Sequence, residues 1–392
     1  MRTLPFLLLF ATPAWAAAPA TLPATLHDLA APDFRTRQAA QAALENAGLD
    51  ALPALRHAAA IETDPEAKSR ELAAIARLED EAALLPTRVT WDFHDATRAD
   101  MIAAIEKATG KPVDVQDDPH PDRPIPKSVT LRIQNQPFWQ AMASLSTAAA
   151  FNVKFPPPFG PCMTIVFGQK SDLAHLQLLS TGSFGWIRQP DLLPAVKMDA
   201  GYFRLPLTCL VDPHLKVIGH TPLHLDAATD ENGNSLLPES QSNRLNIGNP
   251  RILYTSLAIP LTPTHAEVLS IRGHEHFIVA TAEDTLEYPL TGQATRHLGG
   301  RDVSVSTSSV NGHYKANFNF RASPTAPPML FAEFVLKDPT GKELDREEVG
   351  DPPQEGIEYP HDFAPGTRCF LTVASREVEL DVPFNFDNIP LR

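Results

Sequence analysis

Two stretches of the chain decide its fold: residues 89–115, VTWDFHDATRADMIAAIEKATGKPVDV, and residues 128–155, SVTLRIQNQPFWQAMASLSTAAAFNVKF. Each begins with alternating apolar and polar residues, which is typical of a half-buried strand. Each continues with apolar residues at helical spacing and ends in a short extended run. The sequence therefore predicts a duplicated strand–helix–strand unit that forms an α+β layer, with its helices packed on a sheet.

This duplicated unit resembles the short N-terminal domain of secretins and TonB-dependent receptors. The shared features are a strand, two or three polar residues, an amphipathic helix and an extended strand, in the order of the two quoted stretches. The resemblance implies a docking module. The part of a secretin that forms the pore has no counterpart in this sequence.

A helical segment precedes this unit, because residues 26–85 are rich in Ala, Leu, Glu and Arg with apolar residues at helical spacing. The start PDFRTR at residues 32–37 recurs as PEAKSR at residues 65–70. Proline followed by an acidic residue suits the first turn of a helix, and a middle helix is expected over residues 49–60. The pattern resembles a HEAT-like repeat, but a free-standing solenoid needs about three repeats. We expect a small helical cap, with a plain helical hairpin as the alternative.

Helical patterns stop after residue 168, where short alternating strands separated by turn residues indicate β-sandwiches. The pattern D-x-x-G-x-x-L occurs at residues 230–236 and again at residues 338–344, which favours two such domains. In each, Asp is expected to open a turn and Gly to take a positive φ.

The predicted fold class is multidomain α+β, with a short HEAT-like helical region, a secretin-N-like α+β domain and two C-terminal β-sandwiches. The expected segments are a signal peptide (1–16), the helical region (17–86), the α+β domain (87–168), a linker with a first β-strand (169–200), and β-sandwiches over 201–290 and 291–392. This combination is similar to sets of uncharacterised exported bacterial proteins, a resemblance that implies no activity.

The N-terminus predicts export. Arg2 precedes the apolar run Leu4–Ala11, and an A-x-A cleavage site follows at Ala14–Ala16. The apolar run is shorter than the roughly 20 residues of a membrane-spanning helix. No later run is as hydrophobic, so we expect a periplasmic or secreted chain, cleaved after Ala16, without a transmembrane segment.

The net charge limits the class of binding partner, and the cysteine content limits the number of disulfides. A formal net charge of −14 argues against nucleic acid or an anionic membrane surface, since both attract clustered Lys and Arg. The three cysteines, Cys162, Cys209 and Cys369, allow at most one internal disulfide, and whether they pair is left open. Cys209 and Cys369 lie in strand-like runs and are expected to be buried thiols.

The nearest approach to a metal site is the sequence GHTPLHLDA at residues 219–227. His220, His224 and Asp226 share one face of a strand, but residues four apart on a strand are about 13 Å from each other. Asp230 begins a pattern like that of a calcium loop, but Gln241 stands where a bidentate Glu is needed. We therefore expect no metal and no cofactor, with His220, His224, Asp226 and Asp230 as weak candidate ligands.

The sequence predicts no catalytic residue. Residues 182–185, GSFG, do not form a G-x-S-x-G elbow, and glycine-rich phosphate loops are missing. The histidines of GHEHF, residues 273–277, are too restricted by their strand to form a metal site together.

The expected function is that of an exported non-enzymatic protein, a structural or protein-interaction module of the cell envelope that binds protein partners. The alternative is an exported hydrolase or carbohydrate-binding protein with a site between the β-sandwiches, whose residues converge only in space. A deep pocket of titratable groups with shifted pKa values would favour the alternative. The sequence specifies neither the partner nor the oligomeric state.

Overall fold

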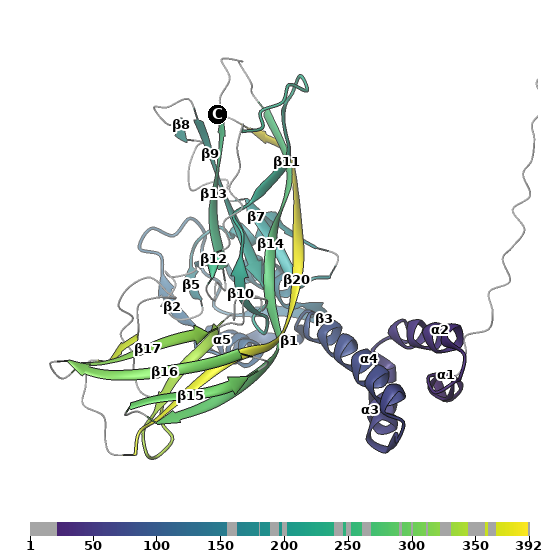
Figure 1. The fold of residues 1–392 in the computed structure, drawn as a ribbon. Coiled ribbons are helices and arrows are strands. Elements are labelled where there is room, and N and C mark those ends of the chain that lie inside the picture. The colour runs from purple at the N-terminus through teal and green to yellow at the C-terminus, as the bar shows by residue number, and fades with distance from the viewer. Residues whose placement is uncertain are drawn as a thin grey trace, which may run out of the picture. The chain divides into compact units, whose positions relative to one another are not determined.

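The computed structural model describes residues 22–154, 163–179, 181–188, 196–197, 202–238, 246–247, 252–260, 268–289, 292–298, 301–310, 313–321, 331–343, 357–359 and 366–390. Within these ranges the protein is a mixed α+β structure with several sheets, and strands predominate over helices (Figure 1). The chain divides into two compact units, Met1–Ala82 and Ala83–Arg392. The predicted signal peptide, residues 1–16, lies outside the described residues.

The first unit is helical, as its sequence predicts. Its core is formed by leucines from successive helices, among them Leu29, Leu44, Leu55 and Leu78. Aspartates begin two of the helices: Asp33 Oδ2 accepts from Thr36 N at 2.9 Å, and Asp64 Oδ1 accepts from Ala67 N at 2.8 Å. None of the helices that the structure describes has the length and hydropathy of a membrane crossing. The elements are α1 (Leu22–Asp28), α2 (Phe34–Glu45), η1 (Leu49–Ala51), α3 (Leu52–Ile61) and α4 (Pro65–Ala83).

The second unit begins with the duplicated strand–helix–strand segment, whose order of elements agrees with the prediction. Thr97 and Asp100 form a capping box that starts the first helix, and Gly110 ends it at a φ of 68°. The second helix ends at Ala150, which takes a left-handed conformation at a φ of 54°. The elements are β1 (Arg88–Ala96), α5 (Arg98–Thr109), β2 (Asp114–Asp117), β3 (Val129–Pro137), α6 (Phe138–Ala149), β4 (Phe151–Lys154) and β5 (Thr164–Phe167).

The strands of this segment form two sheets, which corrects the expectation of a single layer. β1 pairs antiparallel with β3, whereas β5 pairs parallel with β2 and antiparallel with β4. The strand over residues 164–167 is the cause, because it gives β2 and β4 a partner of their own. Both helices contribute to the shared core, which contains Trp91, Ile105, Phe138, Trp139, Phe151 and Phe167.

Two further sheets of the second unit share one core. The order is β13-β9-β7-β6 with β8 beside β9 in one sheet, and β12-β10-β14-β20-β18 with β11 beside β14 in the other. The core they share includes Trp186, Leu207, Phe277 and Phe384. The elements here are η2 (Asp172–His175), β6 (Leu176–Leu178), β7 (Phe184–Arg188), β8 (Val196–Lys197), β9 (Tyr202–Val211), β10 (Lys216–His220), β11 (His224–Asp230), β12 (Asn246–Ile247), β13 (Ile252–Pro260), β14 (Val268–Pro289), β18 (Phe331–Lys337) and β20 (Arg368–Pro390).

The two longest strands, β14 and β20, pair antiparallel from Val268 opposite Pro390 to Pro289 opposite Arg368, side by side in Figure 1. Gly273 lies inside the first of them. Glycine is needed there because a Cβ would overlap the carbonyl oxygen of His224 on β11. Strands from both sides of the boundary predicted at residue 290 thus share one core.

A separate sheet has the order β15-β16-β17-β19. Its strands are β15 (Gly292–Leu298), β16 (Arg301–Val310), β17 (His313–Arg321) and β19 (Ile357–Tyr359). Together with β18 they lie within the region predicted to be the second β-sandwich, residues 291–392. The assignment of that region as a sandwich stays a prediction.

The two D-x-x-G-x-x-L segments form the same turn, as predicted. Gly233 and Gly341 have φ values of 81° and 91°. Asp230 Oδ1 accepts from the main-chain N of the residues two and four positions later, at 2.9 and 2.8 Å. Asp338 Oδ1 makes the equivalent bonds at 2.8 and 2.9 Å. The pKa of both aspartates is lowered, first by the side-chain hydrogen bonds from Asn234 to Asp230 and from Thr340 to Asp338, and then by these main-chain bonds.

Candidate functional site

The first sequence candidate, His220, is paired inside the structure with Glu275, and its cross-strand partner on β14 is Phe277, whereas that of His224 is His274. Nδ1 of His220 lies 2.8 Å from Oε1 of Glu275, a carboxylate from β14 that is almost completely buried. The ring of His220 also stacks on Phe277. Burial raises the pKa of Glu275, although the hydrogen bond to His220 opposes this. The pair is therefore a polar contact within the sheet.

His224 and Asp226 instead meet a residue that the sequence pattern did not connect with them. His224 on β11 lies directly opposite His274 on β14, with ring centroids 5.1 Å apart. The carboxylate of Asp226 lies 3.3 Å from Nδ1 of His274. The sequence places both histidines on strands, but it does not state which strands are neighbours.

Asp230 belongs to the first of the two equivalent turns. Its Oδ1 accepts from Asn232 N and Asn234 N, and its Oδ2 accepts from Asn234 Nδ2 at 2.7 Å. Both carboxylate oxygens are thus engaged by the turn itself. Among the residues that the structure describes, no group of three or more His, Cys, Asp or Glu side chains is arranged to hold a metal ion.

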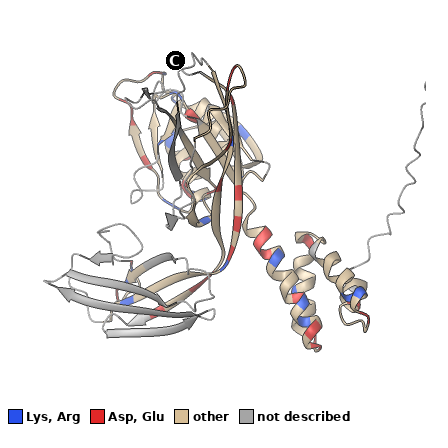
Figure 2. Cartoon of the chain, turned by 45° about the horizontal axis from the view of Figure 1, so that its top comes forward, with Lys and Arg blue, Asp and Glu red and all other residues tan. Residues whose placement is uncertain are grey.

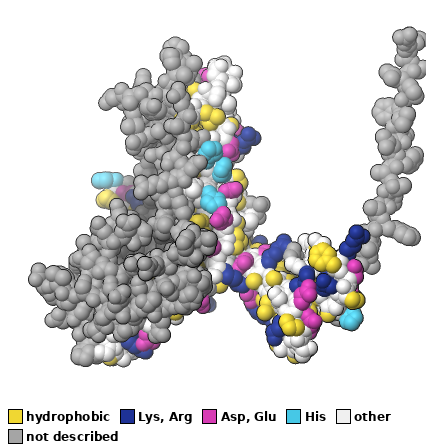
Figure 3. Space-filling view, viewed as in Figure 1, with side chains coloured by type: hydrophobic (Ala, Val, Ile, Leu, Met, Phe, Trp, Pro, Cys, Tyr) yellow, Lys and Arg dark blue, Asp and Glu magenta, His cyan; other side chains and the backbone are white. Residues whose placement is uncertain are grey.

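A third histidine, His276 on β14, extends this surface. His276 Nδ1 lies 3.0 Å from Oδ1 of Asp381 on β20, and its Nε2 lies 3.6 Å from Oε2 of Glu379. Figure 3 shows histidine side chains in a row with acidic side chains between them, and Figure 2 shows acidic residues along the two long strands. We call this surface the β14–β20 face, defined by Asp226, His274, His276, Glu379 and Asp381.

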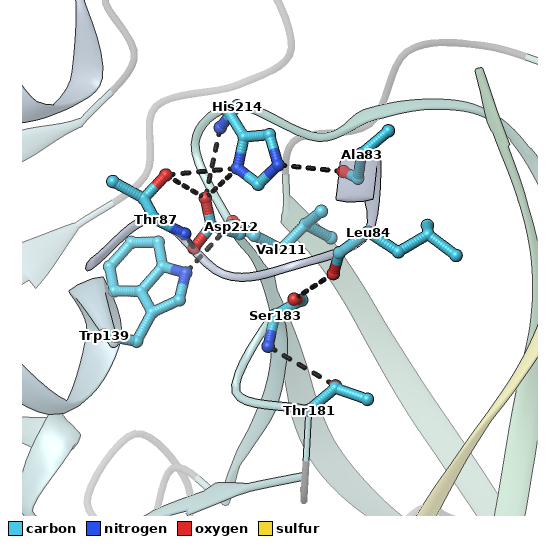
Figure 4. A network of polar contacts seen from close by, with 9 residues as sticks. All are labelled: Ala83, Leu84, Thr87, Trp139, Thr181, Ser183, Val211, Asp212 and His214. Atoms are coloured by element: carbon cyan, nitrogen blue, oxygen red, sulfur yellow. Dashed lines mark hydrogen bonds and ion pairs between the residues drawn. The ribbon is translucent and has the colours of Figure 1, made fainter. Parts of the chain in front are cut away.

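A second polar cluster lies where the chain enters the second unit (Figure 4). Asp212 is almost completely buried. Its Oδ2 accepts from Thr87 N at 2.9 Å, and its Oδ1 accepts from Thr87 Oγ1 at 2.6 Å. His214 Nδ1 lies 2.6 Å from the same Oδ1, and His214 Nε2 lies 2.9 Å from the carbonyl oxygen of Ala83. We call Ala83, Thr87, Asp212 and His214 the Asp212 clasp.

The clasp contains Asp, His and Thr, the residue types of a catalytic triad, but its geometry is that of a structural hydrogen-bond network. In a triad one imidazole nitrogen faces the carboxylate and the other activates the hydroxyl. Here Thr87 lies on the carboxylate side, and Nε2 of His214 faces a main-chain carbonyl. Both ring nitrogens thus face acceptors, which favours the doubly protonated ring. The hydrogen bond to Asp212 is the main cause that raises the pKa of His214.

The clasp makes the stability of the second unit depend on pH. Because the folded-state pKa of His214 is raised, its stabilising contribution is complete below the unfolded-state value of about 6.5 and is lost as pH rises through the folded-state pKa. We expect the difference in unfolding free energy between the wild type and His214→Gln to shrink as pH rises from about 5 to about 9. Denaturant titrations followed by tryptophan fluorescence measure it. A difference that stays constant with pH would contradict the prediction.

Neither the depression beside α6 nor the two cysteines in the described part of the chain offers a group activated for catalysis. A depression of about 720 Å³ is lined by Gln140, Ala143, Ser144, Thr147, Leu173, Leu176 and Leu178, none of which titrates. Cys209 and Cys369 are buried free thiols, and Cys162 lies outside the described residues. Burial raises the pKa of Cys209 far above its usual value and that of Cys369 to about 12, so neither is a ready nucleophile at neutral pH.

Comparisons with known proteins return nothing: no family model, no curated protein and no solved structure matches this chain. Its candidate sites are therefore interpreted from their own geometry. The sequence weighed His274 and His276 only with each other and rejected them as a metal site; their neighbours His224 and Asp381 become apparent only when β14 is placed between β11 and β20.

Proposed function

We propose that this chain is an exported, non-enzymatic protein that acts as an interaction module of the cell envelope. Export is supported by the pattern of residues 1–16. The strand–helix–strand segment supports a docking role through its resemblance to the secretin and TonB-dependent receptor module. The observation that carries the proposal is the β14–β20 face, which offers a partner a charged surface on rigid, paired strands.

The chemistry of the β14–β20 face favours a basic partner. Glu379 and Asp381 are each 69% exposed, and Asp226 is 41% exposed. Arg272 is two residues before His274 on β14 and therefore lies on the same side of the strand. This surface thus carries three carboxylates and one guanidinium. Electrostatic complementarity guides encounter and selects against wrong partners. The proposed partner is an envelope protein with a Lys- or Arg-rich segment.

The test places a photo-crosslinking amino acid at Glu379 or Asp381 in the natural host. The matched control position is Thr340, an exposed residue of the second turn. We expect an adduct from the β14–β20 positions only, in the exported fraction, and its contact peptide should be rich in Lys or Arg. The charge reversal Asp381→Lys, with the probe at Glu379, should reduce its yield by about tenfold, since like charges meet across the interface.

Three results would contradict this function. The first is equal crosslinking from Thr340, and the second is an adduct that the charge reversal does not reduce. The third is full-length protein with an intact Met1 in the cytoplasm, which would exclude export.

A further inference from the structure

The His224–His274 pair has the geometry of a two-ligand metal site. The two residues are direct cross-strand partners, and both rings are half-buried. Two imidazoles on neighbouring positions of one ion, with metal–nitrogen distances of about 2.0–2.1 Å, have ring centres about 4.5–5 Å apart, for tetragonal and tetrahedral ions respectively. The separation found is 5.1 Å, with an interplanar angle of 44°.

Asp226 supplies the orienting contact that such sites use. Its two carboxylate oxygens lie 3.3 Å from Nδ1 of His274. In the neutral ring the proton is then held on Nδ1, and the lone pair of Nε2 is available to an ion. Carboxylates in this position fix both the tautomer and the ring orientation of a ligating histidine.

The backbone around the pair is built to hold this arrangement. The pairing of β11 with β14 is irregular between Leu225 and Ala227, so that Asp226 is the extra residue of a bulge. Bulges redirect side chains and are frequent beside functional sites. On the facing strand, Gly273 lets the His224 carbonyl approach where a Cβ would overlap it. The bulge and the glycine together fix which side chains face each other.

We propose that His224 and His274 bind one divalent transition-metal ion, with Asp226 as the residue that positions His274. Imidazole nitrogen suits Cu²⁺, Ni²⁺ and Zn²⁺, and Cu²⁺ binds such sites most tightly. With two protein ligands the remaining coordination positions are filled by water, so the ion exchanges readily and is not required for folding. This is compatible with the absence of any described group of three ligands. The proposal does not depend on the docking role of the β14–β20 face.

The experiment uses tag-free mature protein and Cu²⁺ alone. Affinity is measured by titration calorimetry, and the number of bound imidazole nitrogens is read from the nitrogen hyperfine structure of the copper electron paramagnetic resonance spectrum. We expect one ion with two imidazole ligands. His224→Gln and His274→Gln should each weaken binding by about tenfold or more and remove one imidazole from the spectrum, and Asp226→Asn should weaken binding by about tenfold.

His276→Gln is the matched control, because His276 lies on the same face of β14 and also contacts carboxylates, but it is opposite Asp381. Its affinity and spectrum should equal those of the wild type. The double variant His224→Gln/His274→Gln reports binding at the N-terminal amine. The proposal is overturned if the double variant binds as tightly as the wild type, or if His276→Gln weakens binding as much as His274→Gln. Circular dichroism of every variant checks that the fold is retained.

Discussion

Replacing Asp212 by Ala is expected to lower the free energy of unfolding of the second unit by about 3–5 kcal/mol. The side chain of Asp212 is fully buried, and its two oxygens accept the main-chain N–H and the hydroxyl of Thr87 as well as the ring of His214. Alanine removes the acceptor of all these donors, and the half-buried N–H and hydroxyl of Thr87 are only partly open to water, so leaving them without a partner is costly. Chemical denaturation followed by the fluorescence of Trp91, Trp139 and Trp186 measures the loss, since all three lie in the second unit.

The control for this change is Asp338→Ala. Asp338 also accepts main-chain N–H bonds, but it does so in an exposed turn. Its replacement should therefore lower the free energy of unfolding much less. Equal losses from the two variants would mean that burial of Asp212 is not the reason for its effect.

Trp139→Ala is expected to lower the free energy of unfolding by about 3–5 kcal/mol. Trp139 is 2% exposed and packs edge-on against Phe138, with ring centroids 5.0 Å apart. Its Nε1–H donates to the carbonyl oxygen of Val211 at 3.0 Å, a buried hydrogen bond that joins α6 to the end of β9. Alanine both opens a cavity and removes this donor. Because Trp91 and Trp186 remain, tryptophan fluorescence still follows the transition.

Trp139→Phe separates the two contributions. Phenylalanine fills most of the space but cannot donate to Val211, so we expect a loss of about 1–2 kcal/mol. If Trp139→Ala costs no more than Trp139→Phe, the indole ring does not support the core in the way its burial indicates.

The parts of the fold that were predicted are those encoded in nearby residues. The helices around Leu55, Ile105 and Leu145 follow from apolar spacing, and the turns at Gly233 and Gly341 follow from a local pattern. The division into two small sheets was not predicted, because strand periodicity shows which face is buried but not which strand lies alongside. The choice of β5 as the partner of both β2 and β4 depends on the packed core.

The candidate sites show the same limit. The sequence draws attention to His224 and Asp226, and both lie at the proposed metal site. The sequence groups His224 with His220 because the two are close along the chain. In the structure the partner of His224 is His274, 50 positions away. Asp212 gave no signal at all, because its contacts with Thr87 join segments 125 residues apart.

The place of β20 in its sheet has a consequence for the order of folding. β20 lies between β14 and β18, so an interior strand of this sheet is supplied by residues 368–390, which are synthesised after both of its neighbours. Until they arrive, β14 exposes main-chain groups along one edge, and the apolar side chains of Leu269, Ile271 and Phe277 lack the cover of Phe384 and Phe386. Pairing over so long a separation is slow, and open apolar edges favour aggregation. β14 must therefore be kept from associating with other chains until β20 has been synthesised and has paired with it.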